Sequence, residues 1–140
     1  MDAFVLDASM TAAWHFRDEE TPITEAVERM TLDRAVVVPR HWFAEMANTL
    51  LVGERRKRAG FADSVRFIDR LADLMLVVDD LEGMDLMTRI LPLARAHGLT
   101  VYDAMYLEVA ERRGLALASL DTELCAAARG VGVEVVVDTL

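Results

Sequence analysis

Short apolar runs rich in β-branched residues alternate along the chain with longer segments whose apolar residues recur every three or four positions. The short runs predict five strands, at residues 3–8, 35–38, 76–78, 115–118 and 133–137. Strands that alternate with amphipathic helices are typical of a parallel sheet buried on both faces. The pattern therefore predicts an α/β fold, with a five-stranded parallel sheet and helices on both faces.

The segments between these runs have the spacing of helices. We expect helices over residues 9–16, 22–30, 41–58, 61–75, 81–96, 100–113 and 121–129. Ser9 is the expected cap of the first helix, and Pro92 should kink the fifth helix or divide it into two pieces. No internal repeat or linker interrupts the pattern, so residues 1–140 are expected to form a single domain.

The hydrophobic content of 54% over 140 residues is enough for a well-filled core. No apolar stretch approaches the ~20 residues of a membrane span, and Met1-Asp2-Ala3 lacks the positive charge that begins a secretory signal. Cys125 is the only cysteine, which excludes an internal disulfide and fits a reducing compartment. We therefore expect a cytoplasmic protein without a membrane segment.

The net charge of −9, from 24 acidic and 15 basic residues, argues mildly against a protein that neutralises many phosphates. A nucleic-acid role must then depend on a local basic patch and on bound cations. The candidate patch is the run Arg55-Arg56-Lys57-Arg58. It either compensates the negative end of its helix or contacts a phosphate backbone or a protein partner.

Two other groups of polar residues are not expected to form sites. An acidic run after the third predicted strand is expected to be a solvated surface: Asp79, Asp80, Glu82 and Asp85. The histidines lack the clustered spacing of a zinc site: His15, His41 and His97.

Acidic residues stand where two of the predicted strands end. Asp7 follows Val5 and Leu6 directly, and its burial would be costly unless a cation meets it. Asp121 follows the fourth strand. Ligands on parallel sheets bind beyond the carboxyl ends of the strands, where the strand order reverses. If the first and fourth strands are neighbours, these two carboxylates share one crevice.

Two further acids lie near helix starts. Asp103 falls in the first turn of the helix at residues 100–113. Glu45 lies off the apolar stripe of the helix at residues 41–58, on a face with His41 and Asn48. Both acids are therefore candidates for the same crevice.

A structural role is the alternative for each acid, because Asp and Glu favour the first turn of a helix, where they accept hydrogen bonds from free N–H groups. Asp121 is a plausible N-cap, and Asp103 lies three residues after the possible cap Thr100. Asp7 fits this alternative least, because it ends a buried strand and Ser9 is the better cap.

Four motifs, taken together, resemble one known family. They are Val5-Leu6-Asp7-Ala8-Ser9 with Trp14 after it, Glu45 with Asn48, Tyr102-Asp103-Ala104-Met105-Tyr106-Leu107, and Leu117-Ala118-Ser119-Leu120-Asp121. In this order and spacing the chain resembles the PIN domains, and specifically the VapC-type toxins of bacterial toxin–antitoxin pairs. The resemblance extends from the first predicted strand to the fifth. Ser119 stands where relatives often have Thr, a departure that keeps a hydroxyl group.

The resemblance implies a PIN domain with the activity of a Mg²⁺- or Mn²⁺-dependent endoribonuclease that leaves 5′-phosphate and 3′-hydroxyl ends. It also implies a VapB-type antitoxin partner and a homodimer. Asp7 and Asp103 look like the direct metal ligands, and Glu45 and Asp121 would complete the site through waters or a second ion. The residues expected to orient the carboxylates or a water are Ser9, Asn48 and Ser119.

Other α/β domains with acids at strand ends fit less well. A receiver domain needs a lysine late in the chain, whereas the only lysine is Lys57. A phosphatase with an aspartyl nucleophile has a second acid two residues later, where this sequence has Ser9. The open alternative is a PIN-like domain that binds RNA or protein without catalysis. The presence of all four acids favours the enzyme.

Overall fold

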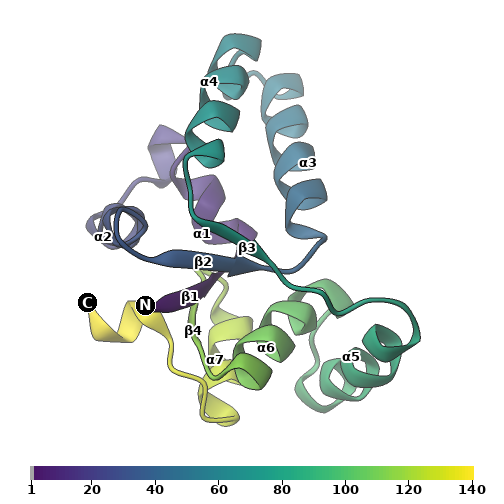
Figure 1. Cartoon of the computed structure of the whole chain (residues 1–140). Coiled ribbons are helices and arrows are strands. Elements are labelled where there is room, and N and C mark those ends of the chain that lie inside the picture. Colours follow the sequence, from purple (N-terminus) through teal and green to yellow (C-terminus); the bar gives the residue numbers. More distant parts are fainter. Residues whose placement is uncertain (1) are drawn as a thin grey trace.

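A parallel sheet of four strands lies at the centre of the computed structural model, which describes residues 2–140 (Figure 1). In sheet order the strands are β3 (Leu76–Val78), β2 (Ala35–Val38), β1 (Ala3–Leu6) and β4 (Ala116–Ala118). The chain runs outward from β1 through β2 to β3, and then returns to place β4 on the other side of β1. The strand order therefore reverses between β1 and β4.

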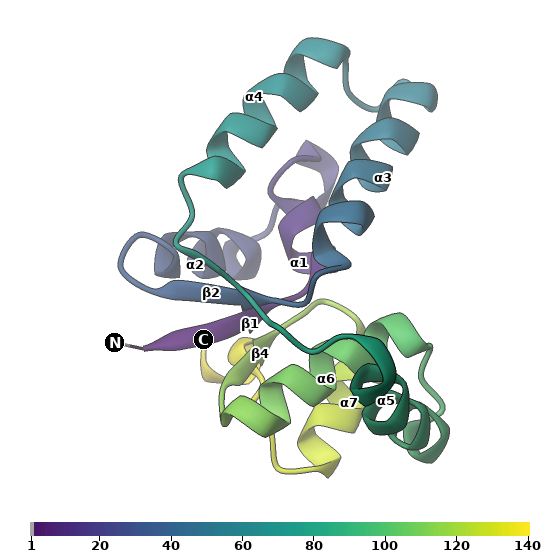
Figure 2. The same cartoon turned by 45° about the vertical axis from the view of Figure 1, so that its right-hand side comes forward.

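Helices cover both faces of this sheet (Figure 1, Figure 2). On one side lie α1 (Ala8–Ala13), α2 (Pro22–Met30), α3 (Trp42–Arg55) and α4 (Phe61–Ala72). On the other side lie α5 (Gly83–His97), α6 (Val101–Arg113) and α7 (Thr122–Gly130). The predicted α/β fold with helices on both faces is confirmed. No helix among residues 2–140 is both long enough and apolar enough to cross a membrane.

Local sequence signals place several helix ends. Thr21 and Thr24 form a reciprocal capping box, and Pro22 occupies the first turn of α2. The hydroxyl of Thr100 caps α6, as its position in the sequence indicated. Pro92 lies inside α5, which is one helix rather than two pieces. Of the two expected effects of the proline, a kink or a division into two pieces, the division is therefore excluded.

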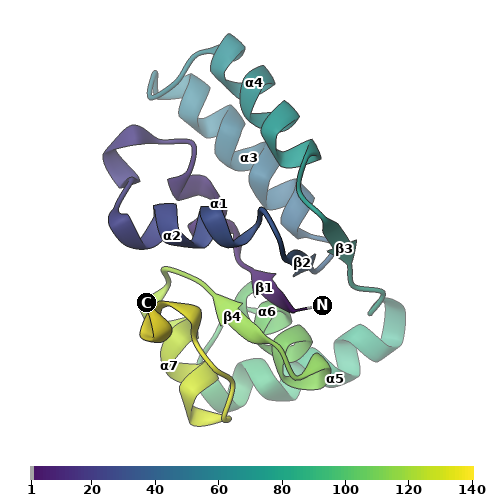
Figure 3. The same ribbon diagram turned by 60° about the vertical axis from the view of Figure 1, so that its left-hand side comes forward.

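The predicted fifth strand, at residues 133–137, is also wrong. Only Val135 pairs with the sheet, through a single parallel bridge to Leu117, and the chain then forms a short 3₁₀ helix over Val136–Thr139 (Figure 3). Two hydrogen bonds of 2.8 Å from Arg129 to Asp138 hold this turn. Val133, Val135 and Val136 are buried nevertheless, because a β-branched run can fill the core without a strand ladder.

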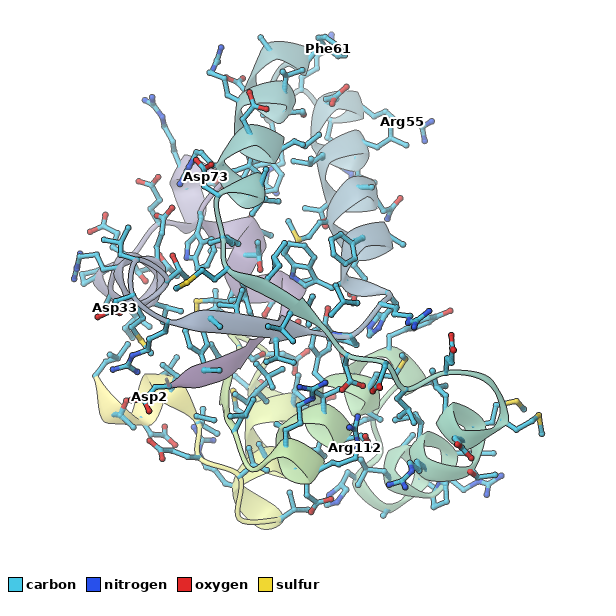
Figure 4. The ribbon with its side chains drawn as sticks, viewed as in Figure 1. Asp2, Asp33, Arg55, Phe61, Asp73 and Arg112 are labelled. Atoms are coloured by element: carbon cyan, nitrogen blue, oxygen red, sulfur yellow. The ribbon has the colours of Figure 1, made fainter. Side chains whose placement is uncertain are left out.

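α3 and α4 form an antiparallel pair that extends away from the sheet, with Arg55 and Phe61 near its far end (Figure 2, Figure 4). Only part of their predicted apolar stripes is buried. Trp42 and Met46 of α3 and Phe67 of α4 lie in the core, whereas Phe61 is 76% exposed. An apolar hollow of about 350 Å³ lies between the two helices. The pair therefore leaves apolar surface uncovered.

Candidate active site

The sheet topology brings the ends of β1 and β4 together. Leu6 pairs with Ala118, and the N–H of the next residue, Asp7, donates to the Ala118 carbonyl oxygen at 3.0 Å. The residue after Ala118 is Ser119, whose hydroxyl donates to Asp7 Oδ2. β1 and β4 are thus neighbours, which is the condition for Asp7 and Asp121 to share one crevice.

Asp7 is 4% exposed, and its hydrogen-bond donors among the described residues are all neutral. The Ser9 N–H donates to Oδ1 at 3.3 Å, and the Ser9 hydroxyl donates to Oδ2 at 2.8 Å. No basic side chain among residues 2–140 forms an ion pair with it. Burial, together with the negative charge of Glu45, raises the pKa of Asp7 despite the hydrogen bonds from Ser119 and Ser9. The pocket therefore disfavours a lone anion.

The structure corrects the predicted start of the first helix. β1 ends at Leu6 and α1 begins at Ala8, so Asp7 rather than Ser9 is the N-cap. A short side chain that accepts from an N–H two residues later is a common cap. Ser9 instead uses its hydroxyl to join two loops, because its oxygen accepts from the Leu120 N–H at 3.1 Å. The structural alternative, an N-cap, therefore does apply to Asp7. The cap uses one hydrogen bond to Oδ1, so the carboxylate can still accept other partners.

Asp121 follows β4 and caps α7, since its Oδ1 accepts from the Leu124 N–H at 2.9 Å. Its own N–H donates to the Ser119 hydroxyl at 3.0 Å. Ser119, which is fully buried, therefore contacts both Asp7 and Asp121. One serine links the two strand-end acids.

Asp103 lies in the first turn of α6, behind the cap Thr100. Burial raises its pKa, and the charges of Asp121, Asp7 and Glu45 raise it further. The charge effects on Asp103 indicate that the other three acids lie near it. Their role as metal ligands stays a prediction.

Glu45 contacts two aromatic side chains that we did not assign to the site from the sequence. The Tyr106 hydroxyl donates to Glu45 Oε1 at 2.7 Å, and His41 Nε2 lies 2.9 Å from the same oxygen, without the geometry of a hydrogen bond. Tyr106 lies three residues after Asp103, one helical turn on, which was the available signal. Asn48 is exposed and forms no side-chain hydrogen bond with residues 2–140, so nothing in the geometry supports its predicted role.

The donor set suits a hard divalent cation. Mg²⁺ and Mn²⁺ prefer carboxylate, hydroxyl and water oxygens, which are the groups present here. Among residues 2–140, no three His, Cys, Asp or Glu side chains are grouped closely enough to hold a metal ion by themselves. Mg²⁺ usually keeps several waters and takes one or two carboxylates directly. A buried Asp7 with no cationic partner in the described part of the chain fits such an ion.

The basic run after α3 is partly used inside the protein. Arg58 forms ion pairs with Asp18 at 2.9 Å and Glu19 at 2.8 Å, and its guanidinium lies 3.9 Å from the centre of the Phe16 ring. α3 ends at Arg55, so the run continues into the turn that follows. Arg58 thus anchors the turn, and a role in binding phosphate stays a prediction for the rest of the run.

The prediction of a solvated acidic run is wrong for Asp79, which is 2% exposed. Arg112 and Arg113 donate to its two carboxylate oxygens at 2.7 and 2.8 Å, and the Leu81 N–H donates at 3.1 Å. Burial raises the pKa of Asp79, but these hydrogen bonds outweigh it and hold the pKa below its usual value. The arginines come 33 and 34 residues later in the chain, so no local pattern announced the cluster.

The fold, with its strand reversal and the acids gathered there, defines the class of the protein. The family model of the PIN domain matches residues 4–130, and the chain belongs to the PIN domain family. The individual relatives are more specific. The chain is 30% identical over 125 residues to Ribonuclease VapC3 of Pyrobaculum aerophilum, and the match covers 86% of this chain and 90% of that protein.

Two solved structures share the fold. The crystal structure of PAE2754 from Pyrobaculum aerophilum matches with a TM-score of 0.74 at 24% identity, over 99% of this chain and 92% of the other. The crystal structure of VapC20 of Mycobacterium tuberculosis, described as a toxin that cleaves the sarcin–ricin loop, matches with a TM-score of 0.63 at 18% identity. That match covers 89% of this chain and 94% of the other.

Proposed function

We propose that this protein is a Mg²⁺- or Mn²⁺-dependent endoribonuclease and acts as the toxin of a toxin–antitoxin pair. The observation that carries the proposal is Asp7, a buried carboxylate without a cationic partner among residues 2–140, at the strand reversal near three more acids. The name of the VapC3 relative supports ribonuclease activity, and the description of VapC20 supports a toxin that cleaves RNA.

In this proposal Asp7 and Asp103 bind the ion directly, and Glu45 and Asp121 hold waters or a second ion. The ion supplies positive charge for the phosphodiester and a polarised water. The protein holds the ligands in place: the hydroxyls of Ser9 and Ser119 fix Asp7 Oδ2. Asp7 Oδ1 accepts only the longer contact from an N–H, so it has more free capacity for a cation. We expect 5′-phosphate and 3′-hydroxyl products; a 2′,3′-cyclic phosphate end would contradict this chemistry.

The direct test mixes purified protein with RNA, with and without Mn²⁺, and compares Asp7→Asn with Asp80→Asn. Asp80 also follows a strand but is exposed and lies outside the site, so it is a matched control. We expect Asp7→Asn to lose more than about 100-fold in cleavage rate, beyond the usual cost of changing a residue that only supports a metal ligand. Asp80→Asn should cleave like the wild type. RNA binding without any cleavage would favour the non-catalytic module instead.

The proposal includes two partners, a VapB-type antitoxin protein and a second copy of this chain. The partly exposed apolar side chains of α3 and α4 and the hollow between them support a protein contact on this side of the molecule. Light scattering of the purified chain measures the dimer. Co-purification with the product of the adjacent gene, followed by loss of RNA cleavage in the complex, tests the antitoxin.

A further inference from the structure

Glu45 is held from the opposite side of the sheet. Its carboxylate belongs to α3, and the Tyr106 hydroxyl that donates to Oε1 belongs to α6 (Figure 1). Tyr106 is fully buried, so its ring cannot move aside without disturbing the core. This hydrogen bond joins α3 and α6 beside the acids.

His41 limits the movement of the same carboxylate. Its ring centre lies 5.0 Å from that of Tyr106 and 5.7 Å from that of Tyr102, and its Nε2 lies 2.9 Å from Glu45 Oε1. Both close contacts are to Oε1, and Oε2 has no hydrogen-bond partner among residues 2–140. The two oxygens of Glu45 thus have different surroundings.

We propose that Tyr106 is a positioning residue, which holds Glu45 Oε1 through its hydroxyl and leaves Oε2 free for the bound ion or its water. This inference rests on the proposed function. Hydrogen bonds that orient metal-binding carboxylates contribute about 10- to 100-fold to metal affinity or activity. A buried tyrosine hydroxyl needs a partner in any case. The test must therefore separate a role that acts through Glu45 from one that only satisfies the core.

The test compares Tyr106→Phe with Tyr102→Phe. Both changes remove one hydroxyl from α6, one turn apart, but Tyr102 is 62% exposed and its hydroxyl has no hydrogen-bond partner among residues 2–140. We expect Tyr106→Phe to lower kcat about 10- to 100-fold with KM for RNA within about 2-fold. Calorimetry should show Mn²⁺ affinity weakened at least about 5-fold, within the range for lost orienting contacts. Tyr102→Phe should change neither quantity.

A double-mutant cycle decides between the two roles. If Tyr106 acts through Glu45, Tyr106→Phe has no further effect on Mn²⁺ affinity in a Glu45→Ala background. An effect as large there as in the wild type, or a Tyr106→Phe variant that behaves like Tyr102→Phe, overturns the inference. A wild type that neither cleaves RNA nor binds Mn²⁺ instead overturns the proposed function, so the two failures are distinct. Thermal unfolding of the metal-free variants verifies that each is folded.

Discussion

Asp7 and Asp79 occupy equivalent places in the fold but have opposite surroundings. Each follows directly after a strand, β1 for Asp7 and β3 for Asp79, and each is almost fully buried. Asp79 receives two guanidinium groups, whereas Asp7 receives two hydroxyls and one backbone N–H. Accordingly, the pKa of Asp79 is held below its usual value and the pKa of Asp7 is raised above it.

Asp79 is thus a carboxylate whose charge is balanced inside the fold, whereas the charge of Asp7 meets no basic side chain among residues 2–140. Helix α6 contributes to both surroundings. Asp103 at its start lies near Asp7, and Arg112 and Arg113 at its end form ion pairs with Asp79. Figure 4 shows Arg112 on this helix. Acids at the start and bases at the end of a helix also suit its dipole. A buried carboxylate with neutral donors either takes up a proton or is balanced by a bound cation, and our proposal for Asp7 is the cation.

The largest expected effect is on stability. Asp79→Asn should lower the free energy of unfolding by about 2–4 kcal/mol, because two arginines lose their partner; their partial exposure keeps the cost below that of a fully buried pair. Asp7→Asn should instead raise it by about 1 kcal/mol in metal-free protein, because a disfavoured charge is removed. Urea unfolding with a chelator measures both. An equal loss of unfolding free energy in both variants would contradict the difference between Asp7 and Asp79.

Bound metal should make the wild type more stable than Asp7→Asn, the opposite of the order expected without metal. Mn²⁺ at about 100 times its dissociation constant is expected to stabilise the wild type by about 2.7 kcal/mol, because only the folded state holds the site. Asp7→Asn should gain much less, and Asp79→Asn should gain as much as the wild type. Thermal unfolding with and without the ion tests this. A full gain in Asp7→Asn would show that the ion binds elsewhere.

The two acids should also respond to pH in opposite directions in metal-free protein. The folded pKa of Asp79 lies below its usual value of 3.8. Its contribution to the stability of the fold is therefore complete above pH 3.8 and is lost as the pH falls through the folded pKa. The folded pKa of Asp7 lies above 3.8, so its ionisation destabilises the fold at neutral pH, and the penalty disappears as the pH falls to 3.8. Unfolding of the wild type and both variants between pH 7 and 3 should therefore show the Asp7→Asn gain vanish first.

The smallest expected effect comes from Glu108, which accepts from Arg112 Nε at 2.6 Å. Glu108→Gln should cost about 1 kcal/mol, because Arg112 keeps Asp79 and is partly exposed. Combined with Asp79→Asn it should cost clearly more than the sum of the two, since Arg112 then loses both acids. Additive losses would mean that the two acids stabilise the arginine independently.

Local patterns were sufficient for most of the fold, and they named four acids whose role as a site stays a prediction. Periodicity and strand-end position indicated Asp7 and Asp121, and the helix turn after Thr100 indicated Asp103. The run at residues 133–137 misled because buried valines look alike in a strand and in a packed turn. The segment also carries a contact between Arg129 and Asp138, which no apolar pattern encodes.

Long-range contacts account for the other differences. Tyr106 reaches Glu45 across 61 positions, and the partners of Asp79 come more than 30 positions later. Such pairs depend on how the helices lie on the sheet, and single motifs do not carry that information. The error at the start of α1 has a local cause instead. Asp7 and Ser9 are both suitable N-caps, and the end of β1 at Leu6 decides for Asp7.

The hydrogen bond between Ser119 and Asp7 joins residues 112 positions apart, and this distance sets when the site can exist during synthesis. Asp7 leaves the ribosome first, while Asp103, Ser119 and Asp121 follow in the last third of the chain. Since β4 must join β1 before the acids meet, a partly translated chain has no complete centre. A nuclease of the proposed kind would therefore lack its complete centre until most of the chain has been made.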